Sequence, residues 1–246
     1  MSLSELVAAT RAAKPSERVS VGFVTRQSAR HDGRAVTYRN HVLSLRVGAA
    51  VGSCAFEPGT LDSADEFVGS TITELLAHPL RAVRVAALDA YLSALRPHPN
   101  PILVPRGSSL EKSMTRAGFV VDLLPPARRV LVVGVVNSIL QTLRARGIDY
   151  VPCDLVGGKT EFGEPIHTDA RAAAAGCDVL LVSGMTIGNG TFDELAALGK
   201  PIVMFAQTGS AIAARLPGVV AVSAEPYPFF WLHGDDSTIY AYGSRP

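Results

Sequence analysis

The glycine-rich segment 183–191 (Ser-Gly-Met-Thr-Ile-Gly-Asn-Gly-Thr) is the strongest candidate binding site in the sequence. Its glycines let backbone N–H groups approach a ligand closely. The segment leads into a predicted helix, whose N-terminus favours an anion through its free N–H donors and its dipole. We therefore expect an anionic group to be held by Gly184, Thr186, Asn189 and Thr191. The alternative is a simple turn in which Thr191 opens a capping box with Glu194.

Polar side chains also follow three other predicted strands: Asn137 and Ser138, then Asp154, then Thr208. In nucleoside-binding folds, an acid after the second strand holds ribose hydroxyls, which is one interpretation of Asp154. A carboxylate that only caps its own loop is the other. The first of these loops keeps only Gly134 of the Gly-x-Gly-x-x-Gly pattern, so NAD is not expected as a cofactor.

A long segment, residues 155–168, carries Glu161, Glu164 and His167. Carboxylates and imidazoles are metal ligands, so a divalent metal ion is the cofactor that these three residues would hold. Glu164 and His167 are also the candidate catalytic acid and base. Their spacing matches no defined metal motif, and a solvated surface loop is the competing interpretation.

The elements that must position these residues fall into two groups. Residues 102–225 alternate short apolar runs with short helical patterns, which is typical of a parallel sheet covered by helices on both faces. Ligands of such sheets bind beyond the carboxyl ends of the strands. Residues 1–97 instead predict helices and an antiparallel hairpin with a third strand. We predict an α/β protein, with a small α+β domain over residues 1–97 and a Rossmann-like domain over residues 102–246.

Other features of the sequence receive structural interpretations. His31 and Arg34 belong to the hairpin turn and are interpreted as a solvated cluster, whereas Glu57 is expected to point into the cleft between the domains. The aromatic run Phe229–Trp231 is expected to pack on its own domain or on another subunit.

Composition excludes several classes of protein. The chain has 246 residues, 48% of them hydrophobic and 18% charged, with a net charge of +1. Disorder is therefore excluded, as is bulk electrostatic attraction to nucleic acid or to an anionic membrane. The longest uncharged runs have about 14 residues, and a spanning helix needs about 20. We expect a cytoplasmic protein, because the first residues lack the pattern of a signal peptide.

Two segments resemble those of a known family. One is Gly69-Ser-Thr-Ile-Thr-Glu-Leu-Leu with the alanine-rich stretch 84–92, and the other is residues 178–195, which contain the segment 183–191. Both are similar to segments of the bacterial and archaeal heavy-metal chelation proteins. The resemblance implies an enolase N-terminal-like domain joined to a Rossmann-like domain, and a link to metal uptake. The chain differs from the family at residues 135–138 and 206–210, in loops expected to line the cleft.

Three hypotheses about function follow. The first is a cytoplasmic protein that binds a small anionic or metal-chelating ligand between its domains, linked to metal uptake or metallophore metabolism. The second is a biosynthetic enzyme that uses an adenosyl or other nucleotide ligand, with Asp154 on the ribose. The third is an oligomeric scaffold that uses Phe229–Trp231 as its interface. In each case we expect a homo-oligomer without nucleic-acid or membrane partners.

Overall fold

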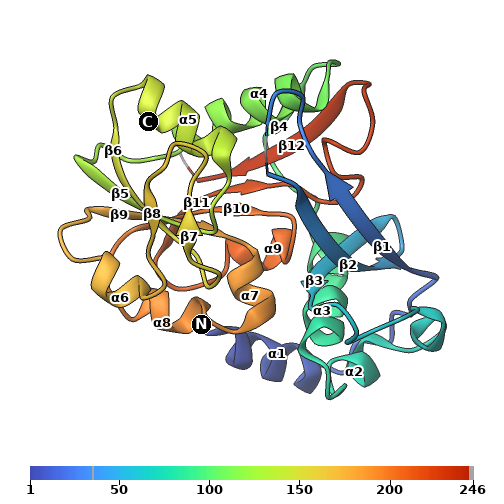
Figure 1. The fold of residues 1–246 in the computed structure, drawn as a ribbon. Helices are drawn as coiled ribbons and strands as arrows, with labels where there is room; N and C mark the ends of the chain where they lie inside the picture. Colours follow the sequence, from blue (N-terminus) through green and yellow to red (C-terminus); the bar gives the residue numbers. More distant parts are fainter. Residues whose placement is uncertain (35, 244–246) are drawn as a thin grey trace.

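The computed structural model describes residues 1–34 and 36–243 and contains two sheets of different kinds (Figure 1). The first unit consists of α1 (Leu3–Ala12), β1 (Val21–Ala29), β2 (Tyr38–Val47), β3 (Ala50–Phe56), a short 3₁₀ turn (Asp65–Phe67), α2 (Ile72–Leu75) and α3 (Arg81–Leu95). Its three strands are antiparallel in the order β1-β2-β3. The predicted hairpin is therefore confirmed, although β2 begins only at Tyr38.

The second unit is built on a seven-stranded sheet with the order β4-β12-β11-β10-β9-β5-β6. Five strands are parallel: β5 (Arg129–Val133), β6 (Asp149–Cys153), β9 (Val179–Ser183), β10 (Ile202–Ala206) and β11 (Val219–Ala224). Two antiparallel strands, β12 (Ser237–Tyr242) and β4 (Pro101–Val104), extend the sheet beyond β11. The predicted α/β class with a sheet rich in parallel strands is confirmed.

Helices cover both faces of this sheet, because its apolar strands alternate their side chains between the two faces. Val130 and Val132 of β5 pack in one core with α4 (Ser109–Asp122) and α5 (Asn137–Ala145). Leu131 packs in the other core, on the side of α6 (Ala170–Ala173), α7 (Met185–Asn189), α8 (Phe192–Ala196) and α9 (Ser210–Ala213). A small hairpin, β7 (Gly158–Lys159) with β8 (Pro165–Ile166), follows β6.

The two units share one of these cores. Buried side chains of β2, β3 and α3 belong to the same hydrophobic cluster as those of β9, β10 and α9. Helix α3 packs closely on β3, since a Cβ atom on Gly52 would lie 2.0 Å from the backbone nitrogen of Ala90. The buried Asp89 of α3 accepts hydrogen bonds from the backbone N–H groups of Ser53 and Ala211, at 3.0 and 2.7 Å. Whether residues 1–97 and 102–246 are separate domains stays a prediction.

Within residues 1–34 and 36–243, none of the helices has both the length and the apolar character needed to cross a bilayer.

Candidate functional site

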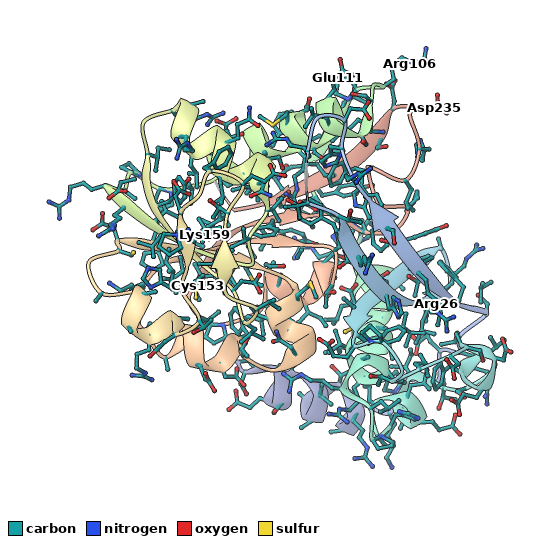
Figure 2. All side chains as sticks on the ribbon, viewed as in Figure 1. Arg26, Arg106, Glu111, Cys153, Lys159 and Asp235 are labelled. Carbon is teal, nitrogen blue, oxygen red and sulfur yellow. The ribbon has the colours of Figure 1, made fainter. Side chains whose placement is uncertain are left out.

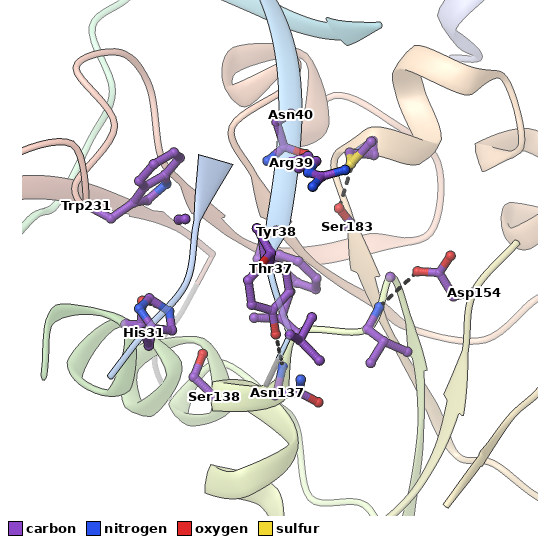
Figure 3. Close-up of a pocket in the computed structure, with 18 of the residues that line it drawn as sticks. His31, Thr37, Tyr38, Arg39, Asn40, Asn137, Ser138, Asp154, Ser183 and Trp231 are labelled. Atoms are coloured by element: carbon purple, nitrogen blue, oxygen red, sulfur yellow. Dashed lines mark hydrogen bonds between the residues drawn. The ribbon is translucent and has the colours of Figure 1, made fainter. Parts of the chain in front are cut away.

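A cavity of about 530 Å³ lies between the β1–β2 hairpin and the carboxyl ends of β5, β6, β9 and β10 (Figure 3). We call it the cleft cavity. The hairpin crosses to the second unit at its tip, where His31 Nδ1 lies 2.9 Å from Ser109 Oγ of α4. Both units line the cavity, and the lining includes five of the predicted site residues. Asn137, Ser138, Asp154 and Thr208 were predicted to bind a ligand, and Glu161 to bind a metal ion.

The hairpin forms one wall of the cleft cavity. Gln27 lies opposite Asn40, and Ala29 lies opposite Tyr38, so these four side chains share one face of the hairpin. The hydroxyl of Tyr38 accepts a hydrogen bond from the backbone N–H of Asn137, at 3.1 Å (Figure 3). Burial raises the pKa of Tyr38, so this hydroxyl stays neutral. His31 and Arg34 of the hairpin turn also line the cavity, so they belong to the site and not to a solvated cluster.

The loops after β5 and β6 form the opposite wall. Gly134 has a φ of +91°, and a Cβ atom there would lie 2.6 Å from Cβ of Ser183, so glycine is required. The carboxylate of Asp154 accepts hydrogen bonds from the backbone N–H groups of Val135 and Val156, both at 3.2 Å. Asp154 thus caps the two loops with both of its oxygens, and its assignment to a ribose has no support in this geometry.

Three side chains that line the cleft cavity each have a buried acceptor oxygen without a hydrogen-bond partner within residues 1–34 and 36–243: Gln27 Oε1, Asn137 Oδ1 and Glu161 Oε1. Gln27 is 9% exposed and Asn137 is 5% exposed. Leaving a buried polar atom unpaired costs about 1–3 kcal/mol, and such atoms are uncommon in folded proteins. These oxygens therefore mark positions where a donor is expected from outside the chain.

A buried ion pair completes the polar lining. Arg116 of α4 donates from Nε and Nη2 to the two carboxylate oxygens of Glu225, at 2.7 and 3.0 Å. The guanidinium carbon lies 4.9 Å from the ring centre of Phe205 and 5.5 Å from that of Phe230. The pattern of the sequence gives no signal for Arg116, because an arginine inside a helix is typical of a solvated face.

The segment 183–191 is not an open glycine loop, and this prediction is corrected. Residues Met185–Asn189 form α7, and Thr191 makes no side-chain cap at α8. The hydroxyl of Thr186 donates to the carbonyl of Ser183 at 2.8 Å, and that of Thr191 donates to Asn189 Oδ1 at 2.9 Å. The two hydroxyls expected to hold an anion thus donate to neighbours within their own segment.

These residues instead border a second cavity of about 590 Å³. Thr186, Asn189 and Thr191 line it together with Glu57, while Gly184 lines neither cavity. A Cβ atom on Gly184 would lie 2.5 Å from the carbonyl oxygen of Thr208, so this glycine serves close packing.

The structure does not assemble the predicted metal site of Glu161, Glu164 and His167. Glu161 and Glu164 lie in the turn between β7 and β8, and each carboxylate pairs with an arginine. Glu161 lies 2.6 Å from Arg34, and Glu164 lies 2.6 Å from Arg144. No group of three or more His, Cys, Asp or Glu side chains is placed to hold a metal ion in residues 1–34 and 36–243.

The predicted acid–base pair, Glu164 and His167, lies outside both cavities. Glu164 also accepts a hydrogen bond from the Tyr150 hydroxyl at 2.7 Å. The backbone of His167 continues the edge of β6, with its N–H bonded to the carbonyl of Pro152, and its side chain is exposed. The acid–base role of these two residues stays a prediction, and neither cavity supports it.

The aromatic run of the C-terminal segment is an internal feature. Phe229 and Phe230 are buried and Trp231 lines the cleft cavity, so Phe229 and Phe230 do not form an exposed interface. The buried ammonium of Lys112 fastens this segment by donating to the carbonyl of His233 at 3.0 Å. On the surface, Arg106 and Asp235 of this segment form an exposed ion pair at 3.3 Å (Figure 2). A homo-oligomer stays a prediction.

The chain is similar to known proteins in sequence and in fold. Residues 118–210 match the model of the DUF364 family, described as "Putative heavy-metal chelation". A DUF364 protein of unknown function from Desulfitobacterium hafniense aligns with a TM-score of 0.55 and 14% identity, over 89% of this chain and 85% of that one. Another, from Pyrococcus horikoshii, aligns with a TM-score of 0.56 and 12% identity, over 99% of this chain and 100% of that one.

A curated protein also matches part of the chain. It is the UDP-N-acetylglucosamine--N-acetylmuramyl-(pentapeptide) pyrophosphoryl-undecaprenol N-acetylglucosamine transferase of Bradyrhizobium diazoefficiens, 32% identical over 185 residues. The match takes in 73% of this chain and spans 47% of the transferase. The resemblance noted in the sequence is confirmed by the family model and the solved structures: residues 118–210 carry the pattern of the heavy-metal chelation family, and the chain has the fold of two of its solved members.

Proposed function

We propose that the cleft cavity binds a small organic molecule that chelates metal ions, and that the molecule brings the metal with it. The observation that carries this proposal is the set of three buried, unpartnered oxygens of Gln27, Asn137 and Glu161 in a cavity of about 530 Å³. Cavities of this size are typical of sites for small molecules, in which a few polar groups fix the orientation of the ligand.

The chemistry of the lining favours an organic ligand over a bare ion. The polar groups come from separate elements. They include amides, hydroxyls and the cationic side chains of Arg34, Arg39, Arg116 and Lys159, which recognise organic groups by hydrogen bonds and charge. The two acidic side chains of the lining already have partners within the chain: Glu161 pairs with Arg34, and Asp154 accepts from the backbone N–H groups of Val135 and Val156. The description of the matching family relates the chain to heavy-metal chelation. The proposal places this binding in the cytoplasm, in metal uptake or metallophore metabolism.

Native mass spectrometry of the gently purified full chain tests this proposal, together with the variant Asn137→Leu. We expect the wild type to retain a small molecule and the variant to lose it. Without ligand, the free energy of unfolding of the variant should be about 1 kcal/mol higher than that of the wild type, because the unpaired amide is gone. Urea unfolding measures that difference.

The matched control is Asn189→Leu, which changes the same kind of side chain at the second cavity. It should keep the retained molecule. If Asn189→Leu lost the molecule and Asn137→Leu kept it, the ligand would lie in the second cavity, and the proposal would be wrong. Stabilisation of the wild type by divalent ions alone, equal to that by any chelate, would contradict the organic ligand.

A further inference from the structure

Two ion pairs in the cleft cavity each leave one charged atom free, and the two free atoms have opposite signs. Arg116 uses Nε and Nη2 for Glu225, at 2.7 and 3.0 Å, and its Nη1 has no hydrogen-bond partner among the described residues. Glu161 uses Oε2 for Arg34, at 2.6 Å, and its Oε1 is buried without a partner there. Both side chains line the cavity and are mostly buried, with 7% of Arg116 and 10% of Glu161 exposed.

Each pair is neutral as a unit, and it leaves one hydrogen-bonding atom of an ionised side chain without a partner. Charge-assisted hydrogen bonds are roughly twice as strong as neutral ones. A carboxylate is the natural partner of the guanidinium Nη1, and an ammonium is the natural partner of Glu161 Oε1. A ligand that carried only one of these groups would leave the other atom unpaired, at the cost of its desolvation.

The neutral acceptors of the cavity favour an ammonium as well. Gln27 Nε2 donates to Thr25 Oγ1 at 2.8 Å, which orients the amide and leaves Oε1 free. Asn137 adds a second free amide oxygen from the opposite wall. An ammonium has three N–H donors, so an amine-bearing ligand can satisfy acceptors that a carboxylate would repel.

We infer that the cleft cavity takes a zwitterionic amino-carboxylate, with its ammonium at Glu161 and its carboxylate at Arg116. This inference rests on the proposed function and names the chemical class of its ligand. Amines and carboxylates are also metal donors. A ligand of this class with additional amines or carboxylates therefore holds a metal ion with the groups that the protein leaves free.

Isothermal titration calorimetry on the full chain at pH 7 compares three metal chelators of differing charge. Ethylenediamine-N,N′-diacetate carries amines and carboxylates, citrate carries only carboxylates and a hydroxyl, and triethylenetetramine carries only amines. We expect the first to bind about tenfold more tightly than the other two, which corresponds to one charge-assisted contact. Converting its carboxylates to amides should cost about the same factor.

The variant Glu161→Gln keeps the shape of the side chain and removes its charge. It should weaken the binding of ethylenediamine-N,N′-diacetate about tenfold, again one such contact. The matched control is Asp62→Asn. The Asp62 carboxylate is 94% exposed, lies 3.2 Å from the guanidinium of Arg26, and does not line the cavity. The control should bind like the wild type. The series of chelators needs no variant, so it decides the question even if Glu161→Gln fails to fold.

Equal binding of citrate, unchanged in Glu161→Gln, would overturn the amino-carboxylate and leave the proposed function standing. So would a retained molecule without an amine in native mass spectrometry. If none of the three chelators binds and the purified chain retains no molecule, both the inference and the proposed function fall.

Discussion

Two titratable side chains, Asp89 and His98, flank one buried serine where the two units meet. Ser210 Oγ lies 3.4 Å from an oxygen of Asp89 and 3.4 Å from Nε2 of His98. Burial raises the pKa of Asp89 to about 6 and lowers that of His98 to about 4. The free energy of unfolding depends on pH wherever a folded pKa differs from the unfolded one. Between about pH 4 and 6.5, the two groups change the free energy of unfolding in opposite directions.

Removing either group should expose the pH dependence of the other. Asp89→Asn leaves His98, whose neutral form contributes stability above its unfolded pKa of about 6.5 and loses it as the pH falls toward 4. His98→Asn leaves Asp89, whose contribution is complete below its unfolded pKa of about 4 and is lost as the pH rises through about 6. Urea unfolding from pH 4 to 7 should show changes of about 2 kcal/mol with opposite signs. Parallel profiles for the two variants would contradict this assignment.

At the scale of elements, the β1–β2 hairpin makes the site by reaching across to α5. The hydroxyl of Tyr38 accepts from the N–H of Asn137, and Arg34 donates to Gln141 and to Glu161. Tyr38→Phe removes the first of these bonds and leaves the N–H of Asn137 without this partner.

We expect Tyr38→Phe to lower the free energy of unfolding by about 1 kcal/mol, and to weaken ligand binding through the displaced Asn137. Thermal unfolding and calorimetry measure the two effects. Tyr91→Phe provides a control in α3, outside the cleft cavity. An equal loss of binding in both variants would show that the bond between the hairpin and α5 has no specific role.

The elements predict part of the site, and the limits have physical causes. Apolar runs followed by polar residues identified Asn137, Ser138, Asp154 and Thr208, because parallel strands bring their carboxyl ends to one edge. Gln27 and Arg116 were missed. The position of Arg116 depends on contacts with Glu225, Phe205 and Phe230, which are distant in the sequence and leave no local pattern. The alternation of the hairpin strands contains a signal for Gln27, on the same face as Tyr38. Strands β4 and β12 were missed. β4 is an edge strand of four residues, and β12, between β4 and β11, alternates buried with more exposed residues instead of forming a continuous apolar run.

At the scale of the whole molecule, the shared core argues against independent halves. Helix α3 is buried along most of its length, including Val83, Ala87 and Leu88, which belong to the core shared with the second unit. A helix that is apolar on all sides needs cover on all sides. Cutting the chain near residue 97 would remove that cover.

We therefore expect residues 1–97, expressed alone, to lack a cooperative unfolding transition, and to regain one when mixed with residues 98–246. Circular dichroism with thermal melting measures both states. A folded fragment with a sharp transition of its own would establish residues 1–97 as an independent domain.

The unpartnered oxygens of Gln27, Asn137 and Glu161 also bear on how long the protein survives in a cell. In the ligand-free chain, these unpaired oxygens lower the free energy of unfolding. A ligand at a hundred times its dissociation constant adds about 2.7 kcal/mol to it. Changes of that size alter the fraction of open chains that proteases can degrade. The abundance of this protein should therefore follow the supply of its ligand, with turnover fastest when the ligand is scarce.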